Sequence, residues 1–590
     1  MSTYLGLTIG PIVKTLSMAE STRELWAASY TIAYLVKEIA KRFDKQYPNR
    51  TWYKPALGQL ARATFDPAAG RFDHIESLQA VERPLVTGVG IFPDHLILDS
   101  TDEADTARMR TVVLEVLDAF AEEVQRELAV NAPSAAVYDV GEIQAYFRQY
   151  FQINIIRKTL TVEEQQQGPI IAMTSVLSVA EMRTSVPDTH SNVLKEYFGL
   201  RGRTLLTKDA FADARKEIRS IPEIALHALI DQDPDLQNKI QRSVWDRSDD
   251  ADHTLDIARQ HVRDQNRKNP KKAKPLLAGH KYIAIVHADG DGVGKFLQAL
   301  PPEKWGAFSE ALSAFSVEAA GIIQNEYGGL PVYLGGDDAL FFAPVIYGDI
   351  NVFTLCRYLN ERFVKRMSSF GTETLTAPTL SFGVSITYAK YPLYEALKIS
   401  MDLLFGPAKR GLETSEPGNG ALKDEDRKYV KNNIAFSLLK GSGNLFGGLL
   451  HLSKQEDYSV LDAFLEVFKN FQGDDGRALR SIIYDLPANQ VLYRHIATDK
   501  TKLANYLANS FDEDIHQGEA VVSYLEAVAT LIHHVYIHWR RYPSLDDYIE
   551  SREEANRETL IPNRMAYGLL KTILFLTAPE VSVETTPAHA

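Results

Sequence analysis

The amino-acid sequence predicts an α+β protein that contains two ferredoxin-like units, a helical insert between them and a helical C-terminal domain. Three observations lead to this prediction. The order strand, helix, hairpin, helix, strand occurs twice; a polar, mostly helical stretch separates the two copies; and the pattern after about residue 430 is helical. We therefore expect a first unit at residues 1–165, an insert at 166–275, a second unit at 276–430 and the helical domain at 431–590.

The first unit begins with a strand-like alternation at residues 4–9, which Gly10-Pro11 interrupts. A helical stripe of apolar residues follows over residues 22–43. The other elements expected in this unit are an apolar run at 85–92, a turn at Pro93-Asp94, a second run at 95–98, a helix at 106–128 and a strand at 151–156. This order is that of a ferredoxin-like fold.

The insert has a mostly helical and polar pattern over residues 165–265, without a detectable repeat. Residues 266–275, NRKNPKKAKP, combine two prolines with a cluster of lysines, which is typical of a surface linker. A basic run can also contact phosphates, so a solvated connector and a phosphate-contacting segment both stay open. The last dozen residues of the chain are expected to be frayed.

The second unit starts with a strand at residues 280–287 that is apolar on both faces in its middle. A helix at 302–327 ends at Gly328-Gly329, and an apolar hairpin with GGDD at its tip follows. The remaining expected elements are a helix at 350–367, a strand at 379–387 and a helix at 393–409. These elements repeat the order of the first unit.

Composition restricts the class of protein. The 590 residues carry a formal net charge of −13, so a polyanionic ligand must meet a local basic patch or a metal ion rather than bulk positive charge. The only cysteine, Cys356, excludes a disulfide framework and a four-cysteine zinc site. The N-terminus lacks the pattern of a signal peptide, and no apolar run has the length of a membrane span. We expect a cytoplasmic protein that has no membrane partner.

The second unit carries the residues that indicate chemistry. Asp289 and Asp291 are expected just past the end of the first strand, in the motif HADGDGVGK. In a ferredoxin-like sheet that strand lies beside the central hairpin, whose tip carries Asp337 and Asp338. A cluster of three or four carboxylates repels itself unless it holds a cation. Hard oxygen ligands on a rigid backbone suit Mg²⁺ or Mn²⁺, with substrate phosphates completing the coordination.

Glycines accompany both acidic segments. Gly335 and Gly336 in the hairpin would let a polyphosphate approach the backbone. In the loop expected after the first strand, glycine amides could face phosphate oxygens; these are Gly290, Gly292 and Gly294. The DGDG segment alone is more typical of an ordinary turn, and GGDD alone fits a turn and a functional site equally well. Their occurrence together, at matching places in one unit, favours a site for a metal and a nucleotide.

Three weaker candidates remain open between a functional and a structural role. Lys409 near the end of the last helix could reach a triphosphate as a point charge, or could be a solvated lysine at a helix end. Ser381 in its strand could line a polar pocket or only fill the strand. The segment FSLLKGSGN at 436–444, which contains Lys440, could line a base-binding pocket or only end a helix.

Four motifs resemble a known family, the large polymerase/cyclase-like subunit of type III CRISPR effector complexes of the Cmr (III-B) kind. The first is IGPIVKTLSMAESTRELWAASYTIAYL near the N-terminus. The others are HADGDGVGK, GGDD, and SFGVSITYAKYPLYEALKISMDLLFGPAKR followed by FSLLKGSGN. They extend over residues 4 to about 445, most of the chain. GGDD alone also occurs in diguanylate cyclases, so the N-terminal block and the double palm-like layout carry the resemblance.

This resemblance implies two palm domains of the nucleotidyl cyclase type, partners that include other Cmr subunits, a CRISPR RNA and a target RNA, and an activity. The second palm would join ATP molecules through 3′–5′ links into cyclic oligoadenylates when target RNA pairs with the guide. Asp337 and Asp338 match the family's catalytic pair, and Asp289 its other metal ligand. The metal ligands would be Asp289, the Gly290 carbonyl, Asp337 and Asp338. Residues expected to contact the nucleotide are Gly335, Gly336, Gly290, Asp291, Ser381, Lys409 and Lys440.

The sequence departs from the family pattern in three ways. No His-Asp dipeptide occurs and the first palm starts at residue 4, so we expect no HD nuclease activity on DNA. One cysteine cannot form the family's zinc site, so we expect no zinc. The first palm offers only Asp94 where the second has GGDD, and should be catalytically empty, serving for docking or for holding a second nucleotide.

Some relatives without the nuclease domain are thought to join ATP to S-adenosylmethionine, and that product stays an alternative. Two other functions also stay open. The chain could be a catalytically silent scaffold subunit, although intact acids on both segments argue against this. It could also be a stand-alone enzyme like a diguanylate cyclase, which would work without RNA and prefer GTP but would leave the N-terminal block unexplained. The acidic net charge suggests that partner subunits hold most of the RNA.

Overall fold

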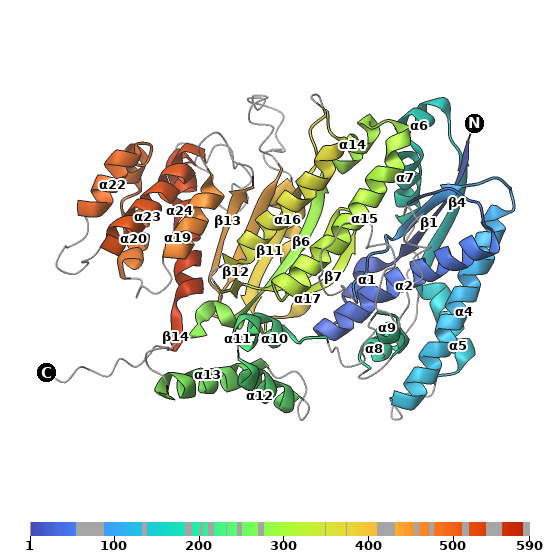
Figure 1. Cartoon of the computed structure of the whole chain (residues 1–590), viewed down its shortest axis with the longest axis horizontal. Coiled ribbons are helices and arrows are strands. Elements are labelled where there is room, and N and C mark those ends of the chain that lie inside the picture. The colour runs from blue at the N-terminus through green and yellow to red at the C-terminus, as the bar shows by residue number, and fades with distance from the viewer. Residues whose placement is uncertain are drawn as a thin grey trace.

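The computed structural model consists of two α/β units and a helical end, arranged in a row (Figure 1). It describes residues 2–54, 88–131, 138–182, 192–200, 204–210, 218–231, 233–244, 251–268, 276–348, 350–372, 375–409, 431–452, 459–470, 477–509, 519–538 and 557–581. Among these residues, no helix combines the length and the apolar character that crossing a membrane requires.

The first unit is a four-stranded antiparallel sheet in the order β2-β3-β1-β4. Its strands are β1 (Thr3–Gly10), β2 (Trp52–Lys54), β3 (His95–Asp99) and β4 (Gln152–Thr159). The alternation of β1 decides its two faces: Leu5, Leu7 and Ile9 pack against the helices α2 (Thr22–Gln46), α4 (Asp105–Asn131) and α5 (Val140–Tyr150). The fold class and the helices at 22–43 and 106–128 are thus confirmed.

The opposite face of this sheet is covered by α7 (Pro169–Glu181), which follows the short α6 (Val162–Gln167). Gly6 allows this close packing, since an added Cβ atom there would lie 2.9 Å from Cε of Met173. The predicted strand at 85–92 is wrong in its described part, because 88–92 contains only an isolated bridge and β2 forms the edge instead. Residues 85–87 lie outside the described residues.

The insert is helical, as predicted; α7 covers the first sheet, and the helices α10 to α13 lie along the lower edge of the molecule in Figure 1. Its further helices are α8 (Val193–Phe198), α9 (Leu205–Ala210), α10 (Ile221–Ala225), α11 (His227–Ile230), α12 (Pro234–Val244) and α13 (Ala251–Lys268). Of the predicted basic linker, residues 266–268 end α13, and 269–275 lie outside the described residues.

The second unit is a six-stranded sheet in the order β13-β12-β11-β6-β8-β7. Its strands are β6 (Tyr282–Asp291), β7 (Leu330–Gly335), β8 (Asp338–Pro344), β11 (Thr379–Tyr388), β12 (Asn433–Leu439) and β13 (Leu445–His451). The part β11-β6-β8-β7 repeats the order of the first sheet, with its first strand between the last strand and the hairpin, which confirms two ferredoxin-like units.

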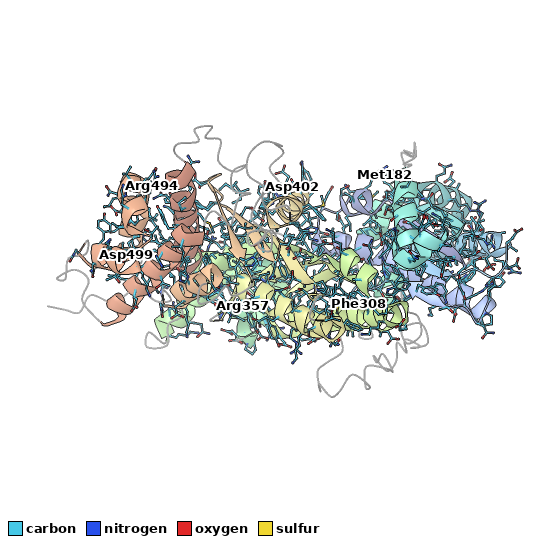
Figure 2. All side chains as sticks on the ribbon, turned by 90° about the horizontal axis from the view of Figure 1, so that it is seen from above. Met182, Phe308, Arg357, Asp402, Arg494 and Asp499 are labelled. Carbon is cyan, nitrogen blue, oxygen red and sulfur yellow. The ribbon has the colours of Figure 1, made fainter. Side chains whose placement is uncertain are left out.

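Helices cover both faces of this sheet. Apolar side chains of α15 (Trp305–Gly321) and α16 (Val352–Met367) pack on one face, and those of α17 (Leu393–Leu403) on the other. Figure 2 shows this separation, with Phe308 of α15 and Arg357 of α16 on one side and Asp402 of α17 on the other.

The prediction that the chain is helical from residue 431 is wrong for residues 433–451. These residues form β12, parallel to β11, and β13, which pairs antiparallel with β12. Six of the seven residues of β12 are buried, so its run is apolar on both faces and its periodicity does not distinguish strand from helix. The segment at 436–444 is therefore the end of a strand and a hairpin turn.

Beyond the sheet the chain is helical where it is described. The helices are α19 (Val460–Asn470), α20 (Arg477–Ala488), α21 (Gln490–Ile496), α22 (Lys500–Asn509), α23 (Glu519–His538) and α24 (Arg557–Thr577). The expected fraying is wrong for β14 (Pro579–Val581), which pairs with β5 (Leu276–Leu277). Residues 582–590 lie outside the described residues.

Short elements complete the described chain. They are α1 (Ile12–Leu16), α14 (Val293–Ala299), β9 (Ile346–Tyr347), β10 (Ile350–Asn351), 3₁₀ turns at Ala278–Lys281, Pro302–Lys304 and Ser368–Phe370, and π turns at Ile322–Glu326 and Leu404–Ala408.

The first unit packs against the edge strand β7 of the second sheet. The amide of Leu334 donates to the Gly90 carbonyl at 3.0 Å, and the Ser29 hydroxyl donates to the Val332 carbonyl at 3.1 Å. Leu25 joins an apolar cluster with residues of β6, β7 and β8. An edge that would otherwise be open is thus covered, and the tip of the β7–β8 hairpin lies beside the first unit.

Candidate active site

The hairpin tip and the end of β6 lie side by side, as predicted. Ala288 of β6 pairs with Ala339 of β8, so the next residues along the two strands are Asp289 and Asp338. A Cβ atom added to Gly290 would lie 2.7 Å from both Cβ and Oδ2 of Asp337. Carboxylates nearly fifty positions apart in the sequence therefore meet at one edge of the sheet.

Asp289 and Asp291 lie within β6 and not beyond its end. Their pairing partners on β11 are Ser381 and Thr379, and these pairs extend the strand to Asp291. The expected glycine loop is shorter as a result, because Gly290 belongs to the strand and Gly292, at φ 74°, leads directly into α14.

The glycines of this site have different surroundings. Gly336 has φ 76° with no atom within 4 Å of an added Cβ, so its left-handed turn is open on that side. Gly335 is enclosed, since an added Cβ would overlap the ring of Tyr333. Gly290 makes room for Asp337. Of these three, only Gly336 leaves open space in which a phosphate could approach the backbone.

The two hairpin acids are in an unfavourable environment. Asp337 is half-buried and Asp338 is exposed. Burial, and then the charge of Asp338, raise the pKa of Asp337 to about 6. Although the Asp338 side chain is exposed, desolvation by the protein atoms around the hairpin tip raises its pKa as well, and Asp94 of the first unit acts in the same direction. Positive charge therefore compensates these acids only in part, through Lys54, and such a site attracts a divalent cation.

Lys409 partly supplies such compensation for Asp289. Its Nζ forms an ion pair with Asp289 and donates to the Gly290 carbonyl at 2.9 Å. It lies 3.9 Å from Oδ1 of Asp291. The lysine thus reaches the predicted site, where it contacts two of the four oxygen donors assigned to the metal.

Asp291 and Ser381 are buried beneath the site. Oδ2 of Asp291 accepts hydrogen bonds from the Thr379 and Ser381 hydroxyls, both at 2.8 Å, and from the amide of Asn432 at 2.9 Å. Burial raises the pKa of Asp291 to about 6, which the hydrogen bonds from Ser381 and Thr379 oppose. Ser381 is 0% exposed and its hydrogen bonds hold strands together, so its contact with a nucleotide stays a prediction that this burial does not favour.

Lys440 lies away from the acidic residues, at the other end of the sheet, so its contact with a nucleotide stays a prediction that this placement does not favour. Leu439, the residue before it, pairs with Thr387, and Thr387 pairs with Ile283 at the opposite end of β6 from Asp289. There the Nζ of Lys440 lies 4.7 Å from the ring centroid of Phe575. Parallel pairing of β12 with β11 places the residue at that end.

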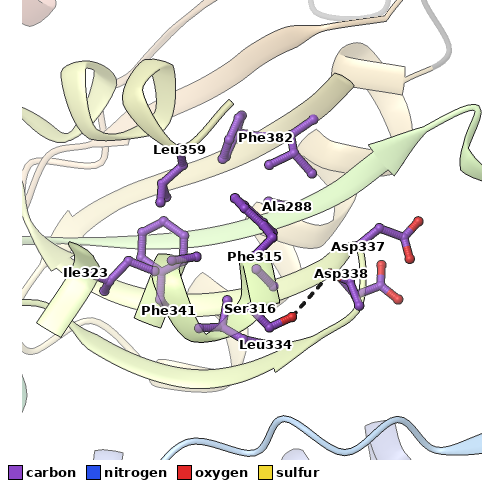
Figure 3. A pocket seen from close by; sticks show the side chains of 14 residues that line it. Ala288, Phe315, Ser316, Ile323, Leu334, Asp337, Asp338, Phe341, Leu359 and Phe382 are labelled. Carbon is purple, nitrogen blue, oxygen red and sulfur yellow. Dashed lines mark hydrogen bonds between the residues drawn. The ribbon is translucent and has the colours of Figure 1, made fainter. Parts of the chain in front are cut away.

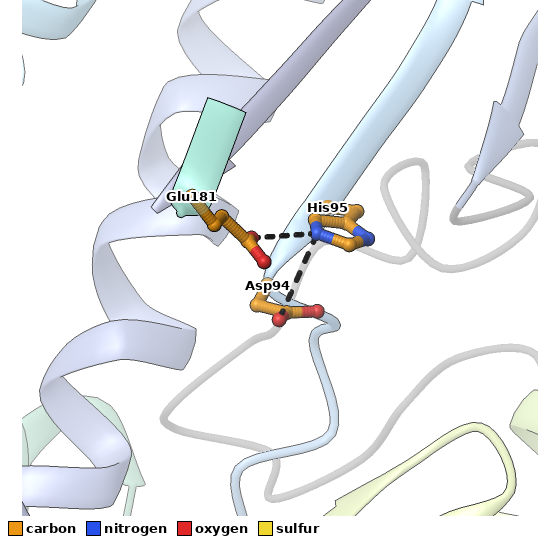
Figure 4. Close-up of side chains that lie close together, drawn as sticks. All are labelled: Asp94, His95 and Glu181. Carbon is orange, nitrogen blue, oxygen red and sulfur yellow. Dashed lines mark hydrogen bonds and ion pairs between the residues drawn. The ribbon is translucent and has the colours of Figure 1, made fainter. Parts of the chain in front are cut away.

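Two charged residues of the first unit were not predicted to act on the acids. Lys54 lowers the pKa of both Asp337 and Asp338, while Asp94 raises that of Asp338. Asp94 also belongs to a small group with His95 and Glu181, whose Nε2 and Oε1 lie 2.8 Å apart (Figure 4). This pair ties the end of α7 to the first sheet. The sequence gives no indication that Lys54 lies near the hairpin, because β2 has only three residues and shows no periodic pattern.

Behind the hairpin lies a small internal space of about 10 Å³, lined mainly by apolar side chains (Figure 3). Asp337 and Asp338 point away from it, and the Ser316 hydroxyl donates to the Gly336 carbonyl at 3.4 Å. The space holds about one water molecule and cannot take a nucleotide base. This space is therefore not a nucleotide-binding pocket.

The donor set fits a hard divalent cation. Asp289, the Gly290 carbonyl and the hairpin acids offer only oxygen, and Oδ1 of Asp291 beneath them is a buried acceptor without a hydrogen bond. Among the described residues, Asp289, Asp337 and Asp338 do not form a group whose oxygens all lie within 4.8 Å of one another. A bound ion would have to draw them together.

Comparisons with known proteins agree with this architecture. The family described as Cas10/Cmr2, second palm domain, matches residues 282–414, and the family described as CRISPR-associated protein Cmr2, N-terminal, matches residues 4–131. The Cmr subunit Cmr2 of Pyrococcus furiosus is 29% identical over 197 residues, which cover 29% of this chain and 20% of that protein.

Two solved structures share the fold. A chain of the type III-B Cmr-beta structure in the apo state superposes with a TM-score of 0.53 at 12% identity, covering 98% of this chain and 81% of the other. For type III-B Cmr-beta bound to cognate target RNA the TM-score is 0.51 at 12% identity, with coverages of 90% and 83%. The two family matches fall on the two ferredoxin-like units in order: the first unit is similar to the N-terminal part of Cmr2, and the second to the second palm domain of Cas10/Cmr2.

Proposed function

We propose that the chain is the large subunit of an RNA-guided type III-B CRISPR complex and that its second palm is a nucleotidyltransferase activated by target RNA. The substrate is ATP, and the products are cyclic oligoadenylates linked 3′–5′. One observation carries the proposal: the GGDD tip lies directly against Asp289 and Gly290, so that oxygen donors from two distant segments converge. The partners are other Cmr subunits, a CRISPR RNA and a target RNA.

In this mechanism the chain acts mainly by positioning. Asp289, the Gly290 carbonyl, Asp337 and Asp338 would hold Mg²⁺ or Mn²⁺, which when bound supplies activation of the attacking hydroxyl and neutralisation of phosphate charge. The open left-handed turn at Gly336 leaves room for phosphate oxygens beside the backbone. The ordered strands fix the donors so that the 3′-hydroxyl of one ATP is in line with the α-phosphate of another and pyrophosphate leaves.

The first palm contributes charge to the same site. Among its described residues, Asp94 raises the pKa of Asp338, and Lys54 offsets part of the charge of the hairpin acids. Its role in the proposal is structural and electrostatic: it covers the edge of the second sheet and faces the GGDD tip.

The test is synthesis by the assembled complex with labelled ATP and target RNA. Asp337→Ala together with Asp338→Ala should reduce product by more than 100-fold, as expected when metal ligands are lost, while assembly is unchanged. Full synthesis by the double variant would refute the assignment of the site. Absence of any product from the wild-type complex would support a silent scaffold instead.

Product identity is decided by mass spectrometry, with and without S-adenosylmethionine. Cyclic oligoadenylates in both conditions support the proposal. A conjugate of AMP with S-adenosylmethionine, formed only when both substrates are present, would replace the ring product while keeping the same site. Activity on GTP without RNA would indicate a stand-alone cyclase.

A further inference from the structure

The side chain of Lys409 is bound to oxygen atoms of the proposed metal site. Its Nζ is paired with the Asp289 carboxylate and donates to the Gly290 carbonyl at 2.9 Å. These are two of the donors that the proposed function assigns to a divalent cation. An ion bound at about 2.0–2.2 Å from both oxygens would lie close to the ammonium group, and the two positive charges repel. The Lys409 ammonium group cannot keep this position while a divalent cation is bound to the same two oxygens.

A second acceptor for Lys409 lies nearby. Oδ1 of Asp291 has no hydrogen-bond partner although it is buried, and it lies 3.9 Å from the lysine Nζ. The other oxygen of this carboxylate already accepts three hydrogen bonds, so the group is held in place. A buried acceptor without a partner is costly, and a shift of Nζ by about 1 Å would bring it to hydrogen-bond distance.

The backbone beneath Lys409 is fixed, so only its side chain needs to move. The carbonyl of the preceding residue, Ala408, accepts hydrogen bonds from the Ser381 hydroxyl at 3.4 Å and from the Asn433 side chain at 3.3 Å. Ala408 is fully buried. Strand β11 and the start of β12 thus hold the point from which the lysine side chain extends.

We propose that Lys409 has two positions: it neutralises Asp289 before a divalent cation binds, and it moves to Asp291 when the cation takes Asp289 and the Gly290 carbonyl. Asp291 is then a positioning residue and not a ligand. The inference rests on the proposed function only in assigning the cation to Asp289. Its consequence is that Lys409 weakens metal binding, whereas Asp291 strengthens it by receiving the displaced lysine.

The experiment measures Mn²⁺ binding to the full chain without nucleotide, by electron paramagnetic resonance. Lys409→Met should bind Mn²⁺ roughly tenfold tighter than wild type, because a like charge is removed. Asp291→Asn should bind it several-fold more weakly, since the displaced lysine loses its charged acceptor. When Lys409→Met and Asp291→Asn are combined, the Asp291→Asn change should no longer lower the Mn²⁺ affinity. Such non-additivity is expected if Asp291 acts only through Lys409. Lys440→Met, a lysine of the same sheet at its far end, should leave the affinity unchanged.

Mass-spectrometric labelling of lysine amines gives a second measurement that does not depend on a variant folding. The reactivity of Lys409 should change when Mn²⁺ is added, and that of Lys440 should not. Unchanged Mn²⁺ affinity in Lys409→Met, with binding lost in Asp289→Asn, would overturn the two-position lysine and leave the proposed function intact. Full Mn²⁺ binding by Asp289→Asn would instead overturn the metal assignment on which the proposed function depends.

Discussion

At the scale of single residues, the site is a set of carboxylates whose positive partners are few. Asp289 has Lys409, whereas among the described residues Lys54 opposes the repulsion between Asp337 and Asp338. Burial adds to that repulsion, and the pKa of Asp337 is raised to about 6. These acids therefore reduce the stability of the metal-free fold, which is a common property of sites that bind a cation.

This cost depends on pH in a definite direction. The folded-state pKa of Asp337 lies above the unfolded value of about 3.9, so the folded chain loses stability as the pH rises from about 4 to 6. Asp337→Asn removes the charge and should raise the melting temperature of the metal-free protein at pH 7.5. The melting temperature should rise by about 2–4 °C for each kcal/mol gained in the free energy of unfolding. This rise should vanish near pH 4, where the wild-type carboxyl is protonated.

Thermal melts in chelator at both pH values measure this effect. The matched control is Asp402→Asn, an exposed carboxylate on α17 whose removal should change little. A lower melting temperature for Asp337→Asn at pH 7.5 would contradict the unfavourable environment assigned to this carboxyl.

Ser381 is a further residue whose role can be decided by mutation. Its hydroxyl donates to Asp291 at 2.8 Å and receives the amide of Asn432 at 3.0 Å. Ser381→Ala should lower the free energy of unfolding by about 1–3 kcal/mol, because buried polar groups lose a partner. Urea denaturation measures it, with the exposed turn variant Ser442→Ala as the control. If Ser381→Ala lost ATP affinity without losing stability, this would support the predicted contact between Ser381 and the nucleotide.

At the scale of elements, the site depends on how closely the hairpin tip approaches β6. Gly290 permits this approach, since its missing side chain leaves the space that Asp337 occupies. The pairing of β6 with β8 on one side and β11 on the other determines which residues share the edge. The geometry is therefore a property of three strands together.

Gly290→Ala tests this approach directly. The added Cβ would lie 2.5 Å from Val293 and 2.7 Å from Asp337, so the hairpin tip must move away. Mn²⁺ affinity and product formation should fall at least tenfold, as expected when catalytic geometry shifts by an ångström. Gly294→Ala in α14 is the matched control, because its added Cβ meets nothing within 4 Å. Equal behaviour of the two variants would contradict the close packing.

At the scale of the whole molecule, the first unit completes the electrostatics of the second. It covers the edge strand β7 through Gly90 and Ser29, and this contact brings Lys54 and Asp94 to the GGDD tip. The two units are thus not equivalent copies. The second unit carries the acidic donors, and charged residues of the first unit shift the pKa values of Asp337 and Asp338.

Lys54→Glu should have opposite effects on two ligands. The reversed charge attracts cations, so Mn²⁺ alone should bind several-fold tighter, while the anionic nucleotide should bind several-fold more weakly. Titrations of Mn²⁺ and of ATP with the same preparation measure the two signs. Lys45→Glu, an exposed position at the end of α2, is the control. Effects of the same sign on both ligands would contradict the placement of Lys54 at the shared site.

The sequence predicted the repeated fold because its periodic elements are long and well marked. The helices near 22–43 and 106–128 and the strands at 280–287 and 379–387 lie where the patterns indicated. It failed at 433–451, where a run buried on both faces was taken for helix, and at β2, where three residues carry no period. Short and fully buried strands acquire their identity from the strands beside them.

By itself, the sequence determined that acidic, glycine-containing segments follow apolar strands in a ferredoxin-like order, and hence that Asp289 would lie near Asp337 and Asp338. Local patterns and the connectivity of the fold suffice for that. Only the tertiary structure decided that Lys409 pairs with Asp289, that Ser381 is buried, that Lys440 lies at the far end and that Lys54 faces the hairpin. The physical reason is that burial and electrostatic interaction depend on distances through space, which residues far apart in the sequence acquire only when the chain is folded.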